Sequence, residues 1–384
     1  MSSLFYLSVF LILVHNILYW LFLFFLSMFL KTSKTSTFET FPSISLIVAA
    51  HNEEKIILQK IKNSLSLEYP EDKIEFIFVS DGSTDNTNTI LSEAAKHNKQ
   101  IQFIPISPQG GKLNALNKAA SIAKGEVLVF SDANTMLDGK CIVELTKVLS
   151  EESVACACGK IIFTNPDETR VSYSESLYWK LENMMKEKES AFYSITALNG
   201  GIYAIRKNDY VILNPLYSHD LCFPLILGKK RRRTIFVKTA LAFERSGTTT
   251  QDESKRKRRM YGRIYHFIAR NPSLFFSPLS YNSRFFFMVF CHRTIRYMLP
   301  FLHILLFVTS FYLYGCGVLF KTTLLLQLFF VTVALVAKLT ETKTKPLFIL
   351  YYYLLFLFTM LMGFLDFITG RLKPFWEIAQ STRS

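Results

Sequence analysis

Two polar side chains that could hold a metal ion follow a short apolar run in the middle of the chain. The run 127–130 ends abruptly at Ser131, and Asp132 and Asn134 come directly after it. Such a run is typical of a buried parallel strand, which delivers polar groups to the carboxyl edge of its sheet. On an extended backbone, residues two apart point the same way, so Asp132 and Asn134 can share one hard cation. A strand-to-helix turn that uses Asp and Asn for their turn preference fits these residues alone equally well.

The elements that must position these residues follow from alternating apolar runs and helical periodicity. From Ile44 onward the pattern predicts strands over residues 44–50, 74–80, 101–106 and 127–130, with a helix after each of the first three. Further along it predicts strands over 154–163 and 202–205 and a helix over 171–190. Each of the first four strands ends in polar or glycine residues, so we expect a ligand where their carboxyl ends meet. The sequence has no GxGxxG or GxxxxGK[ST] motif, which argues against a dehydrogenase or a P-loop ATPase.

Apolar residues are concentrated at the two ends of the 384-residue chain, half of which is hydrophobic. Residues 4–30 are long enough to cross a bilayer about 30 Å thick. The segment has no basic head and no small-residue exit, so we interpret it as a retained helix rather than a cleaved signal. Lys31 and Lys34 place the following residues in the cytoplasm. Three more apolar segments, 301–320, 322–339 and 346–368, bring the predicted spans to four.

This pattern predicts five parts: an N-terminal transmembrane helix (1–31), a cytoplasmic α/β domain (40–275), an interfacial helix (284–297), C-terminal transmembrane helices (300–369) and a tail (370–384). The interfacial helix is expected because His292, Arg293 and Arg296 interrupt a segment that is short for a span. Four crossings leave Arg371 and Lys373 outside, against the positive-inside tendency, so the side of the tail stays open. We expect a multi-pass protein of the plasma or inner membrane.

The net charge of +14 gathers in basic clusters, notably 229–233 and 255–263. Nucleic acid, anionic lipid or a phosphorylated substrate would suit such clusters. Because the chain ends are so apolar, we expect membrane lipid and a phosphorylated substrate as partners, and no nucleic acid. The six cysteines show no metal-binding spacing and are most simply reduced thiols of a cytosolic domain.

Four short motifs occur in order between residues 49 and 137: AAHNEE (49–54), VSDGSTDNT (79–87), GGKLNALN (110–117) and FSDANTML (130–137). Together they resemble the family 2 glycosyltransferases, which include membrane polysaccharide synthases of the cellulose, hyaluronan and chitin synthase type. The resemblance implies an α/β, Rossmann-like GT-A fold. It also implies a nucleotide-diphospho-sugar donor, by family preference a UDP-sugar, and a divalent cation, Mg²⁺ or Mn²⁺.

The same resemblance implies residues that bind the nucleoside, the base, the phosphates and the cation, in that order: Ala49 and Glu53, Asp81, Lys112, and Asp132. The second acid of the metal motif is replaced here by Asn134. An amide carbonyl can still ligate Mg²⁺ or Mn²⁺ but contributes less charge. We therefore expect both residues at the metal, with Asp132 as the stronger ligand.

A candidate catalytic base lies at His219-Asp220, before an apolar helix face. Inverting transfer needs a carboxylate that takes the proton of the acceptor hydroxyl. The resemblance implies such a base in an acidic pair before a helix; Asp220 matches its Asp, and His219 replaces the second acid. The alternative for Asp220 is a helix N-cap. We expect the acceptor at His219 and at Asn199, Gly200 and Gly201, where glycines let a sugar approach the backbone closely, although a plain turn is equally consistent.

The basic segment 251–263 places Arg256, Arg259 and Arg263 on one helix face, where they can clamp the donor diphosphate. Processive relatives carry QxxRW here; aligned on that motif, Arg259 matches while the Gln and Trp are absent. Their absence weakens the case for long-chain polymerisation. A basic helix lying on anionic lipid is the alternative.

The sequence thus predicts a membrane-bound inverting glycosyltransferase that moves a sugar from a nucleotide-diphospho-sugar to a growing glycan. One alternative is the transfer of a single sugar to a lipid acceptor such as a polyprenyl phosphate or a ceramide-like lipid. Another is a non-catalytic, membrane-tethered protein that binds nucleotide sugars, because a fold does not fix an activity.

Overall fold

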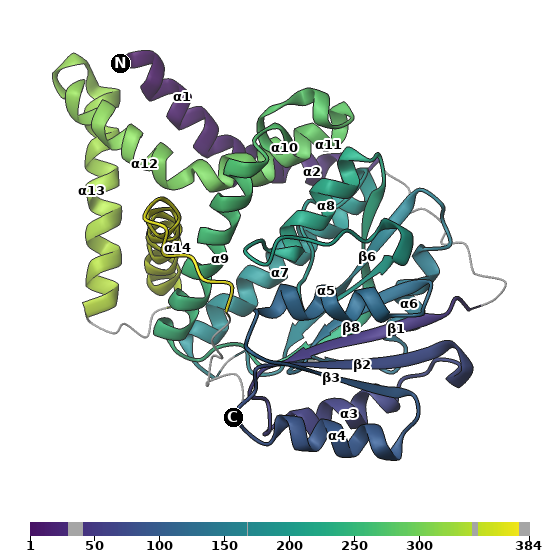
Figure 1. Ribbon diagram of the computed structural model, residues 1–384. Coiled ribbons are helices and arrows are strands. Elements are labelled where there is room, and N and C mark those ends of the chain that lie inside the picture. The colour runs from purple at the N-terminus through teal and green to yellow at the C-terminus, as the bar shows by residue number, and fades with distance from the viewer. Residues whose placement is uncertain (30–40, 167, 340–344, 376–384) are drawn as a thin grey trace.

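The computed structural model describes residues 1–29, 41–166, 168–339 and 345–375, and these contain an eight-stranded sheet (Figure 1). The strand order is β3-β2-β1-β4-β7-β6-β8-β5. The strands are β1 (Ile44–Ala50), β2 (Ile74–Asp81), β3 (Ile101–Ile106), β4 (Val127–Asp132), β5 (Met136–Leu137), β6 (Val154–Phe163), β7 (Ile202–Arg206) and β8 (Arg233–Glu244).

The first four strands of the order are parallel, so their carboxyl ends meet along one side of the sheet, here called the carboxyl edge. In register, Ala49 of β1 lies opposite Val79 of β2 and Asp132 of β4. The six strands predicted from the sequence are all present. Strand β8, which pairs parallel to β6 and antiparallel to β5, was not predicted.

Helices cover both faces of this sheet (Figure 1). Alternate residues of β1 point to opposite faces, so Leu46 and Val48 enter one core and Ile47 and Ala49 the other. The first core is closed by α3 (Ile57–Leu65), α4 (Thr87–His97) and α6 (Cys141–Val148). The second is closed by α5 (Lys112–Ile122), α8 (His219–Lys229) and α9 (Thr250–Arg270). This two-sided cover is the predicted α/β architecture.

A second group of helices lies beside the sheet, with the N-terminus far from it (Figure 1). Within the described residues, four helical segments are long and apolar enough to cross a membrane: Ser2–Ser27, Ser283–Tyr312, Val318–Leu339 and Leu347–Ile368. They comprise α1 (Ser2–Leu13), α2 (Tyr19–Ser27), α11 (Ser283–Met288), α12 (Ile295–Tyr312), α13 (Val318–Leu339) and most of α14 (Lys345–Ile368). These segments support the predicted association with a membrane.

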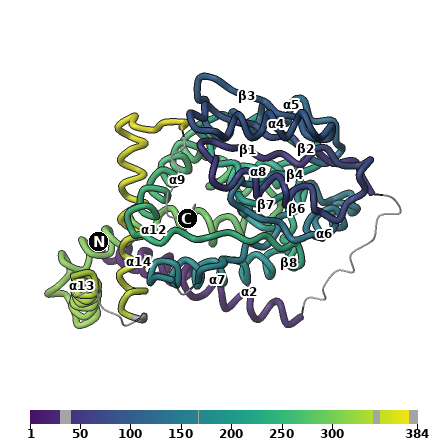
Figure 2. The backbone as a smooth tube through the Cα atoms, turned by 90° about the horizontal axis from the view of Figure 1, so that it is seen from below, coloured from purple at the N-terminus to yellow at the C-terminus, as the bar shows by residue number. Residues whose placement is uncertain are grey.

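The predicted boundary between an interfacial helix (284–297) and a span that starts at 300 is wrong. The helix continues from Ser283 to Tyr312 through Pro300. Arg293 and Arg296 are buried inside the protein rather than lying at a lipid surface, because both donate to the buried carboxylate of Glu182, at 2.7 and 3.2 Å. Glu182 belongs to α7 (Arg170–Phe192), a long helix that α2 also contacts (Figure 2).

Helix α14 packs along α9, and this contact brings the described residues that follow α14 back to the α/β domain. The guanidinium of Arg258 donates two hydrogen bonds of 2.6 Å to Asp366. One turn further, Gly262 and Gly363 let the two backbones touch, since a Cβ on Gly363 would lie 2.8 Å from the Gly262 nitrogen. The two helices are therefore fixed against each other by charge and by close backbone contact.

The residues after α14 lie on the carboxyl edge. Arg263 of α9 donates to the carbonyl of Pro374 at 2.8 Å, and Pro374 fills the space into which a side chain at Gly111 would project. Gly111 has a φ of 94°, a left-handed value that favours glycine. Residues 373–375 thus contact the α/β domain through Arg263 and Gly111.

Candidate active site

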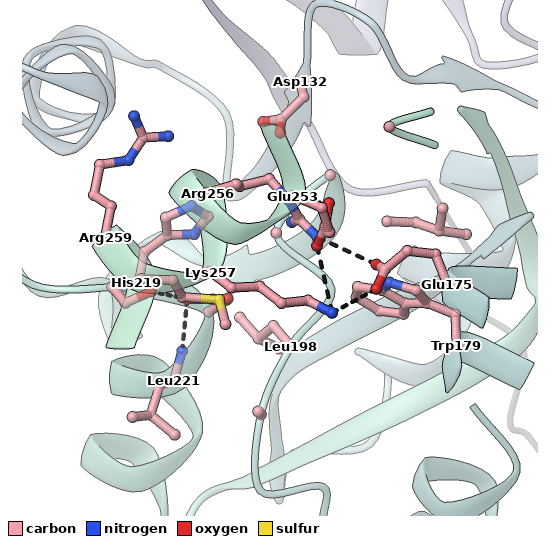
Figure 3. A pocket seen from close by; sticks show the side chains of 18 of the residues that line it. Asp132, Glu175, Trp179, Leu198, His219, Leu221, Glu253, Arg256, Lys257 and Arg259 are labelled. Atoms are coloured by element: carbon pink, nitrogen blue, oxygen red, sulfur yellow. Dashed lines mark hydrogen bonds and ion pairs between the residues drawn. The ribbon is translucent and has the colours of Figure 1, made fainter. Parts of the chain in front are cut away.

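A pocket of 430 Å³ lies where the carboxyl edge meets α8 and α9 (Figure 3). It is lined by residues that the sequence analysis placed in four separate roles, including Ala49, Glu53, Lys112, Asp132, Asn134, Gly200, Gly201, His219, Asp220, Arg256 and Arg259. Residues from the first 137 positions and from positions 200–259 therefore meet around one cavity. Pockets of this size suit small molecules that carry a few convergent polar groups.

Asp132 ends β4 and forms an ion pair with a lysine. The ammonium of Lys112, the first residue of α5, pairs with its Oδ1, and both side chains remain partly exposed to the pocket, at 22 and 29 %. Asn134 donates its amide to Glu244 at 2.9 Å, and Thr135 donates to the other oxygen of the same carboxylate at 3.2 Å. Glu244, which ends the unpredicted strand β8, is thus a site residue that the sequence analysis missed.

These side chains suit a hard divalent cation. Proteins commonly bind Mg²⁺ through one or two carboxylates together with substrate phosphates. Asp132 and Glu244 supply carboxylates and Asn134 an amide oxygen, while Lys112 shows that a positive charge is already favourable beside Asp132. Among the described residues there is no group of three or more His, Cys, Asp and Glu that could hold a metal alone.

A lysine that the sequence analysis did not single out lies beneath this loop. Lys60 of α3 is fully buried and donates to the hydroxyl of Ser131 at 2.8 Å and to the carbonyl of Thr135 at 2.5 Å. Burial lowers the pKa of Lys60 to about 7, although the nearby carboxylate of Asp132 acts to raise it. Lys60 thus joins both ends of the loop that carries Asp132 and Asn134 and holds the loop in place.

Asp81 ends β2, but it contacts the protein rather than lining the pocket. Its carboxylate is fully buried and accepts the backbone N–H groups of Gly110 and Gly111 at 2.8 and 2.7 Å. This pairing fixes the glycine turn at the start of α5 and thereby the position of Lys112. Its predicted contact with the base stays a prediction, because each carboxylate oxygen can accept more than one hydrogen bond.

Asp220 lies in the first turn of α8 and is not its N-cap, since the helix begins at His219 and Ser218 occupies the cap position. One carboxylate oxygen accepts the Ser218 hydroxyl and the Leu221 N–H, the latter at 3.1 Å. His219 beside it is buried, and its Nδ1 has no hydrogen-bond partner among the residues described. Burial and the nearby Lys112 lower the pKa of His219 to about 4, so its ring is neutral at pH 7.

Gly200 and Gly201 line the pocket, but the predicted acceptor contact by the side chain of Asn199 does not fit the structure. That side chain is fully buried: its amide donates to the carbonyl of Gly159 at 2.6 Å and its oxygen accepts from the buried Lys186. The reason is that the buried carbonyl of Gly159 on β6 and the buried ammonium of Lys186 on α7 both need hydrogen-bond partners, and Asn199 supplies them. Asn199 supports the turn that presents the glycines.

The arginines of α9 differ in their partners. Arg256 donates to Glu253 and Glu175, with Nε 3.1 Å from Glu253, and Lys257 beside it lies between the same two carboxylates (Figure 3). Arg259 lies on the opposite side of the pocket from this group. The predicted three-arginine clamp is therefore divided, because Arg256 is paired within the protein and Arg263 is held by backbone carbonyls of the tail.

Known proteins match the part of the chain that builds this pocket. The family model described as Glycosyl transferase family 2 matches residues 45–210. Over these residues, somewhat under half of the chain, the sequence is similar to that family. The structure is similar to that of the mannosyltransferase PcManGT from Pyrobaculum calidifontis, which was solved in complex with GDP-Man and Mn²⁺. The TM-score is 0.71 over 96 % of this chain and 99 % of that one, with 17 % identity, and it confirms the predicted GT-A fold with membrane-type helices at its ends.

The curated relatives are named for different products. Beta-monoglucosyldiacylglycerol synthase of Nostoc is 28 % identical over 220 residues, which cover 54 % of this chain. Poly-beta-1,6-N-acetyl-D-glucosamine synthase of Staphylococcus epidermidis is 39 % identical over 95 residues, which cover 25 % of this chain and 22 % of that protein. The chain spans about half the length of the Nostoc relative, with 46 % covered. The first of these names describes a glycolipid product and the second a polysaccharide.

Proposed function

We propose that this protein is a membrane-bound inverting glycosyltransferase that uses a nucleotide-diphospho-sugar. One observation carries the proposal: Asp132 and Asp220, from the two halves of the domain, line the same pocket as Lys112 and Arg259. One carboxylate is suited to a cation and donor phosphates, and the other to an acceptor hydroxyl. The family 2 domain and its relatives support this activity.

The donor would bind at the carboxyl edge. Ala49 and Glu53 would contact the nucleoside and Asp81 the base, with uridine as the expected base. Mg²⁺ or Mn²⁺, held by Asp132 and Asn134 with Glu244 nearby, would neutralise charge on the diphosphate. Lys112 and Arg259 would stabilise the negative charge that develops as the diphosphate leaves. Arg256 would act indirectly, by fixing α9 through Glu253 and Glu175.

Asp220 would act as the base. It would take the proton of the acceptor hydroxyl as that oxygen bonds to the anomeric carbon and the bond from that carbon to the diphosphate breaks. Ser218 orients the carboxylate, since its hydroxyl donates to the same oxygen as the Leu221 N–H. Neutral His219, with a buried and unpartnered Nδ1 among the described groups, would hydrogen-bond the acceptor beside Gly200 and Gly201.

Of the two acceptors, we favour a lipid over a growing glycan. Helices α12 and α14 contribute Arg296 and Phe356 to the pocket, so its inner end reaches the helices suited to a membrane. The glycan reading is kept as the second candidate because of the similarity to the Staphylococcus epidermidis synthase. We also propose that the protein is multi-pass, with its catalytic domain in the cytoplasm, where sugar nucleotides are made.

A donor screen tests this proposal. Full-length protein in detergent would be incubated with labelled sugar nucleotides, Mn²⁺ and total membrane lipid, and the products separated by size. We expect label in a single-sugar lipid product that is lost without the cation. A ladder of long products would instead support glycan synthesis. If neither transfer nor hydrolysis is seen with any donor, the enzyme proposal is overturned, and a non-catalytic protein that only binds nucleotide sugars is the alternative that remains.

A further inference from the structure

A second cavity, of 730 Å³, lies between α9 and the helices α13 and α14. It is here called the lateral groove. One wall is apolar and comes from α13 and α14: Ala337, Phe348, Tyr351, Leu355, Phe358 and Met362. The other wall is polar and comes from the starts of α7 and α9 and the loop before α9, including Thr169, Arg170, Thr250, Gln251, Ser254 and Lys255. An amphipathic ligand would satisfy both walls.

The groove is also positively charged. Four cations line it: Arg170, Lys255, Arg258 and Lys338. No carboxylate is found among the described residues that line it. Arg258 is neutralised by Asp366, and Arg170 lies 5.7 Å from the ring of Phe348, whereas Lys255 and Lys338 are exposed. An anionic group in the groove would therefore gain favourable charge interactions with at least two ammonium groups.

The two walls together restrict the ligand. A soluble phosphate would leave the apolar wall, with the 57 % exposed Phe358, in water. A neutral lipid would leave the lysines without a counter-charge. A phospholipid satisfies both, because its chain can lie against α13 and α14 while its phosphate meets the lysines, much as such lipids meet basic residues at a membrane surface.

The lateral groove adjoins the active-site pocket through one residue. Lys255 lines both cavities, and Arg259, which lines the active-site pocket, follows it by one helical turn on α9. A headgroup held at Lys255 is thus adjacent to the pocket that holds Asp220. This adjacency makes the groove a route by which a lipid can present its headgroup to the donor.

We propose that the lateral groove binds a phospholipid whose headgroup carries a free hydroxyl, and that this lipid is the acceptor. The inference rests on the proposed function. In the transfer step the headgroup hydroxyl loses its proton to Asp220, its oxygen bonds to the anomeric carbon, and the bond to the nucleoside diphosphate breaks. The nucleoside diphosphate leaves with that electron pair, so the reaction needs no further reactant.

Binding to the full-length protein in detergent tests the groove. The probe is dioleoyl phosphatidylglycerol, which has chains, a phosphate and a hydroxyl, detected by native mass spectrometry. Diolein lacks the phosphate, and glycerol 3-phosphate lacks the chains. We expect phosphatidylglycerol to bind at least tenfold more tightly than either. Equal binding of diolein would identify a neutral-lipid site, and equal binding of glycerol 3-phosphate a soluble-phosphate site; each result would overturn the proposal.

Two variants locate the binding. Lys338→Glu reverses a charge in the groove and Ser254→Trp fills it, and we expect each to weaken phosphatidylglycerol binding at least tenfold. Lys321→Glu, on the same helix α13 but outside the groove, is the matched control and should change binding less than twofold. Equal losses in Lys338→Glu and Lys321→Glu would mean unspecific attraction to a basic protein and would reject the groove.

Donor binding separates this inference from the proposed function. Calorimetry with UDP-sugars and Mn²⁺ should give the same affinity for wild type and both groove variants, which also shows that the variants are folded. If phosphatidylglycerol binds in the groove but no sugar nucleotide binds, the proposed function fails and the lipid site remains. If sugar is transferred to other acceptors and phosphatidylglycerol neither binds nor accepts it, the groove proposal alone fails.

Discussion

The two ends of the active-site pocket differ in whether their charged side chains face the pocket or pair within the protein. At the carboxyl edge, Asp132 and Lys112 are partly exposed and face open space. At the helical end, seven charged side chains pair almost entirely with one another; all but Arg256, which is 42 % exposed, are buried. We call this set the helical ion network: Glu175, Glu182, Glu253, Arg256, Lys257, Arg293 and Arg296. The first arrangement leaves charge available to a ligand, and the second uses it to join α7, α9 and α12.

This difference indicates which residues act and which support. Removing one member of a buried ion pair leaves a charge without a partner, so it costs folding free energy. Removing a partly exposed group that faces the pocket costs little stability but removes a ligand contact. Substitutions at the carboxyl edge should therefore lower activity without unfolding the protein. Substitutions in the helical ion network should instead mainly lower the stability of the fold.

The largest effect is expected for the base. Asp220→Asn should lower the rate of transfer about 10²- to 10⁴-fold, since a neutral amide cannot accept the proton. Binding of the sugar nucleotide, measured by calorimetry, should be unchanged. Asp72→Asn, at an exposed position away from the pocket, serves as the control and should retain the wild-type rate. Undiminished turnover by Asp220→Asn would remove Asp220 from the mechanism.

Next comes a paired test on α7. Glu182→Gln leaves Arg293 and Arg296 without their carboxylate and should cost about 3–5 kcal/mol of stability, seen as a lower midpoint of thermal unfolding. Glu187→Gln on the same helix breaks only an exposed pair with Lys238 and should cost about 1 kcal/mol or less. The comparison breaks if Glu182→Gln unfolds at the wild-type temperature but has lost transfer.

The two neighbouring arginines of α9 sharpen the contrast. Arg259→Gln should weaken donor affinity about tenfold or more, because a charge-assisted hydrogen bond to the diphosphate is lost. Arg256→Gln should mainly lower the unfolding midpoint, since Arg256 is paired with Glu253 and Glu175. Titration calorimetry and thermal unfolding of both variants decide it. Should the two effects be exchanged, Arg256 would be the donor ligand that the sequence suggested.

The smallest effect concerns Lys60. Its pKa is about 7 in the folded protein and about 10.4 in an unfolded chain, so between these values the unfolded state binds more protons. Lys60 therefore makes stability rise as pH increases from 7 toward 10, and adds no slope below 7. Lys60→Met should lack this rise, as measured by thermal unfolding across pH. Lys62→Met, an exposed lysine on the same helix, should keep it.

The carboxyl edge could be predicted from the sequence because its signals are local. A strand such as β4 shows as an apolar run, and its functional residues follow within a few positions. The sequence suggested that Asp132, Lys112 and Asp220 would meet, and they line one pocket. The same reasoning misjudged Asn199 and the helix at 284–297, where buried polar groups had found partners far along the chain.

The helical ion network could not be predicted in this way, because its partners lie far apart in the sequence. Nothing near Glu182 marks it as the partner of Arg293, 111 positions away. Two other residues did leave a signal. Lys60 shares the buried face of α3 with Ile57, Ile61 and Ser64, and the segment that forms β8 and ends at Glu244 contains two short apolar runs, 235–237 and 240–243.

The contact of Pro374 with Gly111 has a practical consequence for handling the protein. Phe375, the last residue described, lies close to the carboxyl edge, whereas Met1 lies at the far end of the molecule (Figure 1). A label attached to the side chain at position 375 would therefore lie beside the carboxyl edge, where the proposed donor binds. The same label on the amino terminus would begin at the opposite extremity, and assays of donor affinity should use it there.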